Sequence, residues 1–581
     1  MSFLNSFIIL EKYLSKSAII LFFMMLISMI IETLSIGMVI PAISILLDDQ
    51  SFFKNNLAMS FLSFLGNPSR DMLIIITMIV IVIIFTIKSL YLIMFNWFQA
   101  KFIFNVQISL SNKLFAGYIW QPYLFHLNRN SSSLIRNIIT EINTFASCTT
   151  SIIILFTEIL VFIGISTLLI IYEPLGSIMS LFIFCLAGLI FYSLFKNRMS
   201  FWGTERQKFD EKKIQYIQEG LGGIKESKIY NKENIFIKQF NKQAIGSSEM
   251  GKRINFLSTF PRLFLELLII IVMSVFVIYL ISNNNSYQSI IATLGLFAVA
   301  AFRLLPSINK IISSIQFLRY NLPVLNLIND EISLVKKVSQ VHELIDPIKF
   351  EESIQIKDLT FSYDQKTNIL ESLNLKINKG EKIGFIGETG SGKSTLVDII
   401  LGLLSPTDGE ILVDGKNINE SIKGWQTNLG YVPQTIFLSD DTLKRNIAYG
   451  FSDDQINDNT IMDSISSAQL NKFVNQLEKK YDTKVGERGV RLSGGQRQRI
   501  GIARALYNNP NVIIFDEATS ALDYETENEI MKIINSLKEK TILIIAHRVN
   551  TLKDCDKVYE LNNGRLSEKS YEEIKQDNKN N

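Results

Sequence analysis

Long apolar segments occupy most of the first half of the chain. A helix needs about 20 apolar residues to cross a bilayer. Six segments reach that length, at residues 18–47, 72–97, 146–172, 175–195, 256–281 and 289–312. The first is too long for a secretory signal sequence and has no small-residue cleavage site after it, so we expect it to be retained. The pattern predicts a six-helix transmembrane domain over residues 1–319.

The connections between these segments differ in length and charge. The stretch 196–253 holds 13 Lys and Arg residues and the stretch 101–136 holds four, whereas the two short connections hold none. The positive-inside rule then puts the long connections, both termini and the second half of the chain in the cytoplasm. The segment 48–71 would lie outside, as a short amphipathic helix on the membrane surface.

The net charge and the cysteines argue against a nucleic-acid partner, a disulfide and a cysteine metal site. The net charge of +3 is too small to indicate a nucleic-acid partner. The three cysteines lie far apart and match no metal-ligand spacing, so we expect neither a disulfide nor a cysteine metal site.

A glycine-rich stretch at residues 387–394 has the Gly-x4-Gly-Lys-Ser pattern of a phosphate-binding loop. Its glycines let backbone N–H groups surround phosphate oxygens, Lys393 reaches the outer phosphates, and Ser394 can ligate Mg²⁺. A predicted strand at 383–386 precedes it and a predicted helix at 394–404 follows, which is the context such a loop requires. The candidate nucleotide-binding residues here are Gly387, Glu388, Thr389, Gly390, Ser391, Gly392, Lys393, Ser394 and Thr395.

Two carboxylates follow the apolar stretch 512–515. Asp516 is placed to hold Mg²⁺, directly or through water, and Glu517 to polarise the water that attacks the terminal phosphate. The alternative is that an apolar strand simply ends in acidic residues. The phosphate loop upstream favours the catalytic interpretation.

Over its last 230 or so residues the chain resembles the ATP-binding cassette family. Tyr363 matches the aromatic residue that stacks on adenine, and Gln434 matches the glutamine that contacts Mg²⁺ and senses the membrane domain. His547 matches the switch histidine that contacts the γ-phosphate. Residues 520–523, Ser-Ala-Leu-Asp, match the loop that contacts the second cassette.

The sequence Leu-Ser-Gly-Gly-Gln at 492–496 matches the family signature. It opens a predicted helix, so N–H groups and the helix dipole face an anion. The resemblance implies that this anion is the γ-phosphate held by the partner subunit, with signature residues Ser493, Gly494, Gly495 and Gln496.

Residues 485–489 resemble a loop typical of ABC exporters. Six spans fused to one cassette imply a half-transporter: an α-helical exporter-type transmembrane domain, a linker at 320–350, an α/β P-loop nucleotide-binding domain at 351–567 and a disordered tail at 568–581. The resemblance implies ATP and Mg²⁺ as cofactors. Because Lys393, Glu517, His547 and the signature are intact, a homodimer with two active sites is expected.

Charged residues inside apolar segments are costly and usually mark function. Six form a belt at the level of the inner leaflet: Glu32, Lys88, Glu158, Arg262, Glu266 and Arg303. They could be internal ion pairs, since Arg262 and Glu266 are four residues apart on one helix. Alternatively, the cations bind an anionic lipid headgroup that enters from the inner leaflet.

The membrane half is also similar to flippases of lipid-linked oligosaccharides of the PglK type. The shared stretches are Ile31-Glu32-Thr33 with Pro41, Phe260-Pro261-Arg262 with Leu265-Glu266, and Phe-Arg-Leu-Leu-Pro-Ser at 302–307. The resemblance implies that Arg262 and Arg303 engage a pyrophosphate. Lys88 stands where that family has arginine, which keeps the charge but loses the bidentate fork.

Together these features predict an ATP-driven flippase that moves a polyprenyl-pyrophosphate-linked oligosaccharide across a bacterial cytoplasmic membrane. Short helices near 121–130 and 215–224 would pass the motion of the cassettes to the membrane helices. The alternatives are an exporter of another lipid, a lipid A-like glycolipid or a hydrophobic drug, and, in a different class, an ATP-gated channel or regulator.

Overall fold

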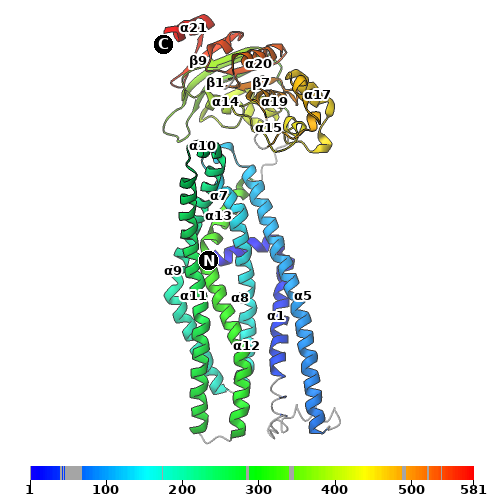
Figure 1. Cartoon of the computed structure of the whole chain (residues 1–581), viewed down its shortest axis with the longest axis vertical. Coiled ribbons are helices and arrows are strands. Elements are labelled where there is room, and N and C mark those ends of the chain that lie inside the picture. Colours follow the sequence, from blue (N-terminus) through cyan, green and yellow to red (C-terminus); the bar gives the residue numbers. More distant parts are fainter. Residues whose placement is uncertain are drawn as a thin grey trace. The chain divides into compact units, whose positions relative to one another are not determined.

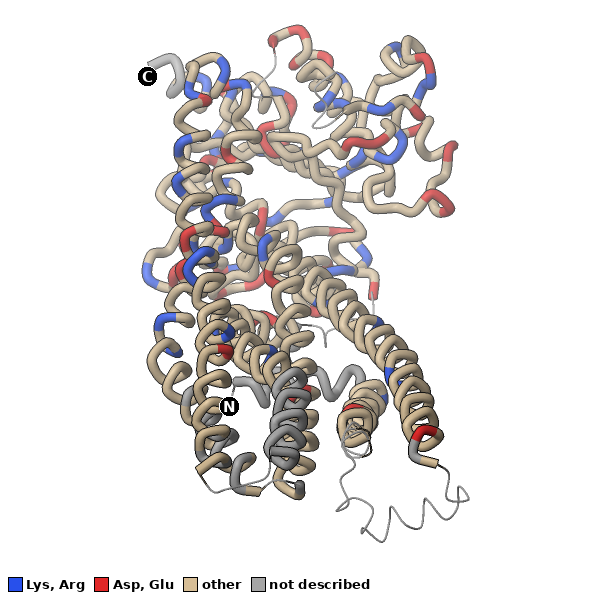
Figure 2. Tube along the Cα trace, turned by 60° about the horizontal axis from the view of Figure 1, so that its bottom comes forward, with Lys and Arg blue, Asp and Glu red and all other residues tan. Residues whose placement is uncertain are grey.

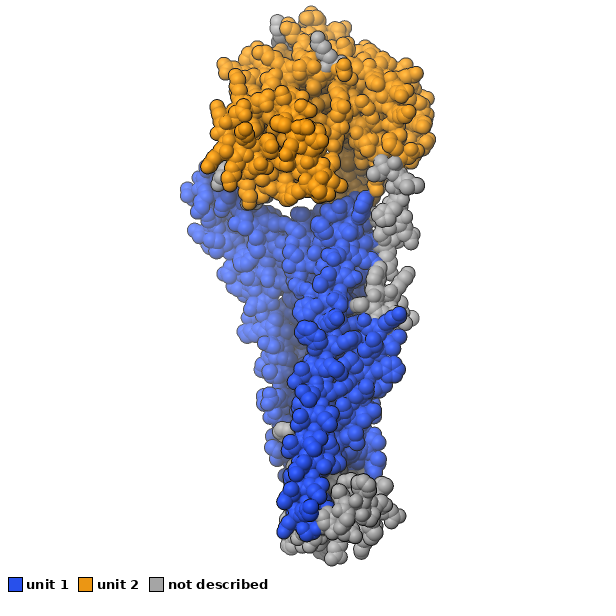
Figure 3. Space-filling model, turned by 90° about the vertical axis from the view of Figure 1, so that its right-hand side faces the viewer, with its two compact units in different colours: residues 1–121, 128–340 blue, residues 122–127, 341–581 orange. Residues whose placement is uncertain are grey.

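The computed structural model describes residues 2–38, 42, 45, 69–172, 174–282, 287–338, 346–486, 492–519, 523–537 and 539–580. The chain forms two compact units (Figure 3). Unit 1 comprises Met1–Gln121 and Asn128–Gln340, and unit 2 comprises Pro122–Leu127 and Val341–Asn581.

Unit 1 is built from helices within the described residues (Figure 1). They are α1 (Ser2–Gly37), α5 (Arg70–Ile119), α7 (Ser131–Arg136), α8 (Ile142–Tyr172), α9 (Pro174–Gly222), α10 (Ile224–Ile229), α11 (Glu233–Ser282), α12 (Tyr287–Tyr320) and α13 (Leu322–Val338). A π-helical turn, Asn137–Glu141, precedes α8. Helix α8 packs against α1 and α12, and α9 packs against α11.

The long helices extend well beyond the predicted apolar spans. Helix α5 has 50 residues, about 75 Å of helix, whereas its predicted span covers only 72–97. Long stretches of these helices carry no charged residue (Figure 2). The backbone thus continues unbroken from the apolar stretch into the charged one, because helical hydrogen bonding does not depend on the polarity of the side chains.

Four segments of the described residues are long and apolar enough to cross a membrane: Lys16–Gly37, Asp71–Ile119, Ser131–Ile171 and Glu233–Val275. The predicted spans 175–195 and 289–312 lie within α9 and α12 and stay predictions. The predicted outer segment 48–71 lies outside the described residues except for its last three.

Helix α13 lies within the predicted linker. Its buried residues Val324, Leu325, Ile328, Ile332 and Val335 recur at helical spacing. They let the helix pack against α5 and other helices of unit 1. This part of the linker is therefore an integral helix of unit 1.

Unit 2 contains two sheets. The smaller is antiparallel in the order β2-β1-β4-β5 and the larger has the order β10-β9-β3-β8-β7-β6. The strands are β1 (Ser353–Phe361), β2 (Leu370–Asn378), β3 (Lys382–Ile386), β4 (Asp408–Val413), β5 (Lys416–Asn417), β6 (Leu429–Val432), β7 (Val512–Asp516), β8 (Thr541–Ile545), β9 (Lys557–Asn562) and β10 (Arg565–Lys569). The helices of this unit are α6 (Tyr123–Leu127), α14 (Lys393–Ile400), α15 (Ile422–Gln426), α16 (Leu443–Ile447), α17 (Asp458–Ser467), α18 (Asn471–Gln476), α19 (Gly494–Leu506), α20 (Tyr524–Ser536) and α21 (Tyr571–Asn580).

The prediction of a disordered tail is wrong. Residues 571–580 form α21, and Ile574 is 4% exposed in the core of unit 2. Ile574 packs in a buried apolar cluster of unit 2, a tertiary contact that the polar composition of the tail does not predict.

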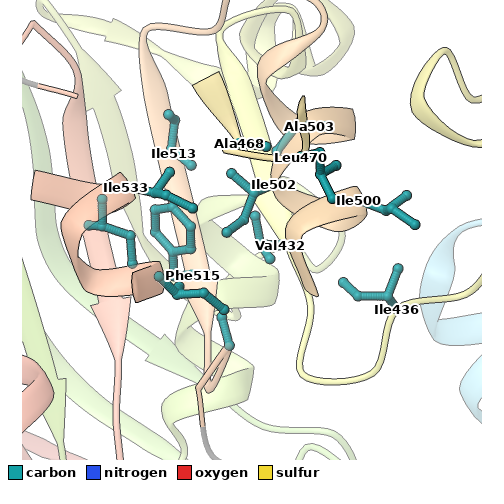
Figure 4. Close-up of a cluster of buried hydrophobic side chains, with 14 of the residues drawn as sticks. Val432, Ile436, Ala468, Leu470, Ile500, Ile502, Ala503, Ile513, Phe515 and Ile533 are labelled. Atoms are coloured by element: carbon teal, nitrogen blue, oxygen red, sulfur yellow. The ribbon is translucent and has the colours of Figure 1, made fainter. Parts of the chain in front are cut away.

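A buried apolar cluster fixes the signature helix to the large sheet (Figure 4). Ile502 of α19 lies beside Val432 of β6 and Phe515 of β7. Each fully buried side chain of this size contributes about 1.5–3 kcal/mol. The cluster therefore holds the ends of β6 and β7, which carry candidate site residues, in a fixed relation to α19.

Candidate functional site

The candidate site lies at one edge of the larger sheet. Strands β3, β8, β7 and β6 are neighbours and run parallel, so their carboxyl ends meet at the same edge. The segments that follow these strands carry Lys393, His547, Glu517 and Gln434 respectively. Four regions spaced over more than 150 residues are thereby brought together.

The phosphate loop after β3 depends on glycine at two positions. Gly387 has φ 157° and Gly392 has φ 104°. A Cβ on Gly387 would lie 2.2 Å from the carbonyl oxygen of Leu561. Only glycine permits this close approach together with this backbone conformation.

The loop closes around the side chain of Lys393. Its Nζ donates to the carbonyl oxygens of Gly387 at 2.7 Å and Glu388 at 2.8 Å. Burial lowers the pKa of Lys393, while the nearby carboxylates of Glu517 and Asp516 raise it. The cation is thus held in the loop, at the place where the phosphate groups of a nucleotide would lie.

Glu517 lies between the side chains of Gln434 and His547. Nε2 of Gln434 donates to Oε2 of Glu517 at 2.6 Å, and Nε2 of His547 lies 2.6 Å from Oε1. The backbone of Glu517 has φ +48°, and its N–H donates to the carbonyl oxygen of Ile545 at 3.0 Å. A left-handed conformation is uncommon at a residue with a side chain and persists where the surrounding structure holds it.

Asp516 has a partner that the sequence analysis did not assign. The hydroxyl of Tyr431 donates to Oδ2 of Asp516 at 3.1 Å. Burial and the Glu517 carboxylate raise the pKa of Asp516, while the bond from Tyr431 and the charge of Lys393 lower it. Burial, and in second place the nearby Asp516 carboxylate, raise the pKa of Asp398 in α14 to about 6. The one available signal for Tyr431 was its place at the end of β6, three residues before Gln434.

Replacing Tyr431 by Phe should raise the Mg²⁺ concentration that half-activates ATP hydrolysis by about three- to tenfold. The phenol holds one carboxylate oxygen of Asp516, and a lost hydrogen bond costs about 0.5–1.5 kcal/mol. The measurement is ATPase activity against Mg²⁺ concentration, with the exposed Tyr524→Phe as the matched control. An unchanged Mg²⁺ dependence in Tyr431→Phe would mean that the phenol does not position Asp516.

The signature helix has a well-formed N-terminus. Ser493 is the N-cap of α19: its hydroxyl accepts from the N–H of Gln496 at 3.2 Å, and the Gln496 side chain accepts from the N–H of Ser493 at 2.9 Å. Gly495 is packed so closely that a Cβ would lie 2.5 Å from Thr526. The capping box fixes the first turn of the helix, which includes Gly494. The backbone N–H groups of such a turn can bind an anion.

Two further predicted loops lie largely outside the described residues, namely 487–489 of the exporter-type loop at 485–489 and 520–522 of the dimer-contact loop at 520–523. The last residue of the latter, Asp523, caps α20 by accepting from the N–H of Thr526.

The predicted adenine-stacking residue is accessible. Tyr363 is 44% exposed, and its ring packs edge-on against Phe361. Its hydroxyl lies 3.2 Å from the hydroxyl of Thr395, at the start of α14. Glu388, Thr389, Gly390 and Ser394 are also exposed, whereas Ser391 is half-buried.

The residues proposed for Mg²⁺ fit that ion. Ser394, Gln434 and Asp516 supply oxygen donors, which Mg²⁺ prefers. Among the described residues no group of three or more His, Cys, Asp and Glu is arranged as a metal site. Few protein ligands suffice where the phosphates of the nucleotide and water complete the coordination.

The charged belt of unit 1 contains close ion pairs. Nζ of Lys88 lies 3.4 Å from Oε2 of Glu32, and Nε of Arg262 lies 2.9 Å from Oε1 of Glu266. The side chain of Arg303 lies outside the described part of the structure.

Glu158 has partners that the sequence analysis missed. Lys310 Nζ and Ser307 Oγ each donate to it at 2.6 Å. They are about 150 residues away along the chain, so no local spacing could have indicated them.

Comparison with known proteins agrees with this architecture. Residues 370–520 match the family model described as ABC transporter, and residues 16–304 match the ABC transporter transmembrane region. The chain is similar to an ATP-dependent lipid A-core flippase of Saccharophagus degradans, at 30% identity over 484 residues, which are 81% of this chain and 80% of that protein.

Two further similarities bear on the cassette and on the fold. A Staphylococcus aureus protein named for multidrug export, an ATP-binding/permease protein, is 42% identical over 226 residues, 38% of this chain and 39% of that one. The structure of a bacterial Atm1-family ABC exporter with ATP bound superposes with a TM-score of 0.79 at 20% identity, over 98% of this chain and 97% of that chain.

A relative that is 30% identical over most of both chains, together with matches to both halves, shows the family. The chain belongs to the ABC transporters: it is a membrane protein with the fold of an exporter half-transporter, whose cassette hydrolyses ATP to drive transport.

Proposed function

We propose that this chain acts as a homodimeric flippase for a polyprenyl-pyrophosphate-linked oligosaccharide in the bacterial cytoplasmic membrane. The observation that carries the transport mechanism is the arrangement of Glu517 between Gln434 and His547. It supports an intact hydrolytic site, whereas ATP-gated channels and regulators of this family often have a damaged one. Pumping therefore fits the site better than gating.

Each residue of the candidate site has its own role in ATP binding or hydrolysis. Tyr363 stacks on the adenine, and Lys393 binds the outer phosphates. Glu517 polarises the attacking water and accepts its proton, while His547 contacts the γ-phosphate. Ser394, Gln434 and Asp516 would hold Mg²⁺, which neutralises phosphate charge. Ser493 and the N-terminus of α19 act on the nucleotide of the partner subunit.

Helix α6 packs against the same buried cluster as the helix that follows the phosphate loop. Leu124 packs against a buried cluster of unit 2 that includes Leu396 and Val397 of α14, the helix that follows the phosphate loop. Residues 122–127 stand in sequence between α5 and α7, which belong to unit 1. If α14 moves when ATP binds, α6 would move with it, and α6 is joined in sequence to helices α5 and α7 of unit 1.

The substrate proposal rests on the cations of the belt. The side chain of Arg262 is 70% exposed and that of Glu266 is 40% exposed, so a pyrophosphate can approach the guanidinium and compete with the carboxylate. Lys88 is only 15% exposed and paired with Glu32, which gives it a smaller role. Arg303 completes the proposed set.

Arg262→Ala and Arg303→Ala should each raise the half-stimulating concentration of a polyprenyl-pyrophosphate glycan at least about tenfold in the ATPase assay. A hydrogen bond to a charged group contributes about 1.5–3 kcal/mol. The matched control is Lys252→Ala, an exposed cation on the same helix. Stimulation that is unaffected in both arginine variants would remove the main support for a pyrophosphate substrate.

A second candidate substrate is favoured by the relatives. The Saccharophagus protein is named a lipid A-core flippase, so a lipid A-like glycolipid is the alternative cargo, followed by a hydrophobic drug. The same assay separates them, because only the true cargo stimulates the wild-type dimer. The cytoplasmic position of both termini and of unit 2, inferred from the positive-inside rule, completes the proposal.

A further inference from the structure

A pocket of about 700 Å³ lies inside unit 1. Residues of α1, α5, α8, α11 and α12 line it. Its size falls within the about 300–1,000 Å³ that is usual for small-molecule sites. The lining is rich in amides and hydroxyls, although four of these five helices, α1, α5, α8 and α11, contain segments apolar enough to cross a membrane.

Three buried polar atoms on the pocket wall have no hydrogen-bond partner in the described part of the chain. They are Ser28 Oγ, Gln316 Oε1 and Tyr320 Oη. The exposed fraction is 1% for Ser28, 2% for Gln316 and 6% for Tyr320. The other end of the Gln316 amide is bonded, since its Nε2 donates to the carbonyl oxygen of Leu257 at 3.3 Å. Buried polar groups are almost always satisfied, so three in the lining residues of one pocket, from α1 and α12, indicate a polar occupant.

The charges around this pocket cancel. The lining carboxylates are Glu32, which pairs with Lys88 at 3.4 Å, and Glu158, which pairs with Lys310 at 2.6 Å. Each cation is thus close to a carboxylate. A pyrophosphate needs a surplus of positive charge, which these pairs do not supply. The pocket instead suits an uncharged group that both donates and accepts hydrogen bonds.

We propose that this pocket binds sugar residues of the lipid headgroup, apart from the cations assigned to the pyrophosphate. The inference rests on the proposed function in that the cargo carries a glycan. Sugar hydroxyls can donate to the Gln316 carbonyl and exchange hydrogen bonds with Ser28 and Tyr320. Asn96, Gln99 and Asn255 offer further amides on the same lining. Phe95 and Phe317 supply apolar surface for the faces of the sugar ring.

Protection of an introduced thiol tests the pocket directly. Ser313 lines it, so Ser313→Cys in a full-length dimer with Cys148, Cys185 and Cys555 replaced by alanine gives one label site for a water-soluble maleimide. The dimer is reconstituted in lipid nanodiscs. The probes are a polyprenyl-pyrophosphate oligosaccharide, the same polyprenyl pyrophosphate without sugar, and a lipid A-type glycolipid.

The sugar-bearing cargo should slow labelling, and the sugarless lipid should not. In that background Ser28→Ala, Gln316→Leu and Tyr320→Phe should each raise the half-protecting concentration about three- to tenfold. The control is Ser274→Ala, an exposed serine of α11 that does not line the pocket. Elution of all variants as dimers in size-exclusion chromatography, with an unchanged thermal unfolding temperature, excludes misfolding as the cause.

The outcomes separate this inference from the proposed function. If the lipid A-type glycolipid protects the thiol and the polyprenyl-pyrophosphate glycan does not, the sugar pocket stands and the proposed cargo is wrong. If the polyprenyl-pyrophosphate glycan stimulates ATP hydrolysis but protects no better than the sugarless lipid, the cargo stands and the sugar pocket is wrong. Equal protection in wild-type and all three variants also overturns the pocket.

Discussion

Glu517→Gln should lower ATP turnover at least about 100-fold while leaving ATP binding intact. General base catalysis contributes about 10²–10⁴-fold, and glutamine has the size of glutamate without a basic oxygen. The amide can still contact Gln434 and His547, whose nitrogens lie 2.6 Å from the two oxygens of Glu517. The variant should therefore keep the geometry of the site but lack the general base. Steady-state ATPase activity and binding of a fluorescent ATP analogue measure the two effects.

The matched control is Glu525→Gln, which makes the same chemical change at an exposed residue in the first turn of α20. Its turnover should equal that of the wild type. Flipping by Glu517→Gln should fall in parallel with hydrolysis, because the cycle would stop after the cassettes close. Turnover above about a tenth of the wild-type value would exclude Glu517 as the base.

Local patterns correctly predicted the strand and the helix that flank the glycine-rich loop. The strand before residue 387 and the helix after it depend on neighbouring residues, and the structure has β3 and α14 there. The i,i+4 pair of Arg262 and Glu266 was also readable from spacing alone, and it lies at 2.9 Å.

Contacts between distant parts of the chain could not be predicted. Tyr431 and Asp516 are 85 residues apart, and Lys310 and Glu158 are 152 apart. Their proximity depends on the order of strands β6 and β7 in one case and on the packing of α8 against α12 in the other. The burial of Ile574 in the C-terminal helix α21 is likewise set by tertiary packing.

The pairing of the two cassettes should be visible in mixed dimers that carry two lesions. Lys393→Ala disables the phosphate loop, whose lysine bonds to two loop carbonyls, and Ser493→Arg blocks the N-terminus of α19, where Ser493 is the cap. Each homodimer should lose essentially all turnover. A dimer with one lesion on each chain places both at the same shared site and leaves the other site whole.

That dimer should therefore hydrolyse ATP like a dimer of one wild-type chain and one Lys393→Ala chain, which also keeps one complete site. The control has the same two lesions on one chain and a wild-type partner: each shared site then carries one lesion, so it should be inactive. Sites contained within single chains would give the reverse, an inactive first dimer and an active second one. Purification through two different affinity tags and ATPase assays distinguish the two results, because the lesions are identical and only their distribution between the chains differs.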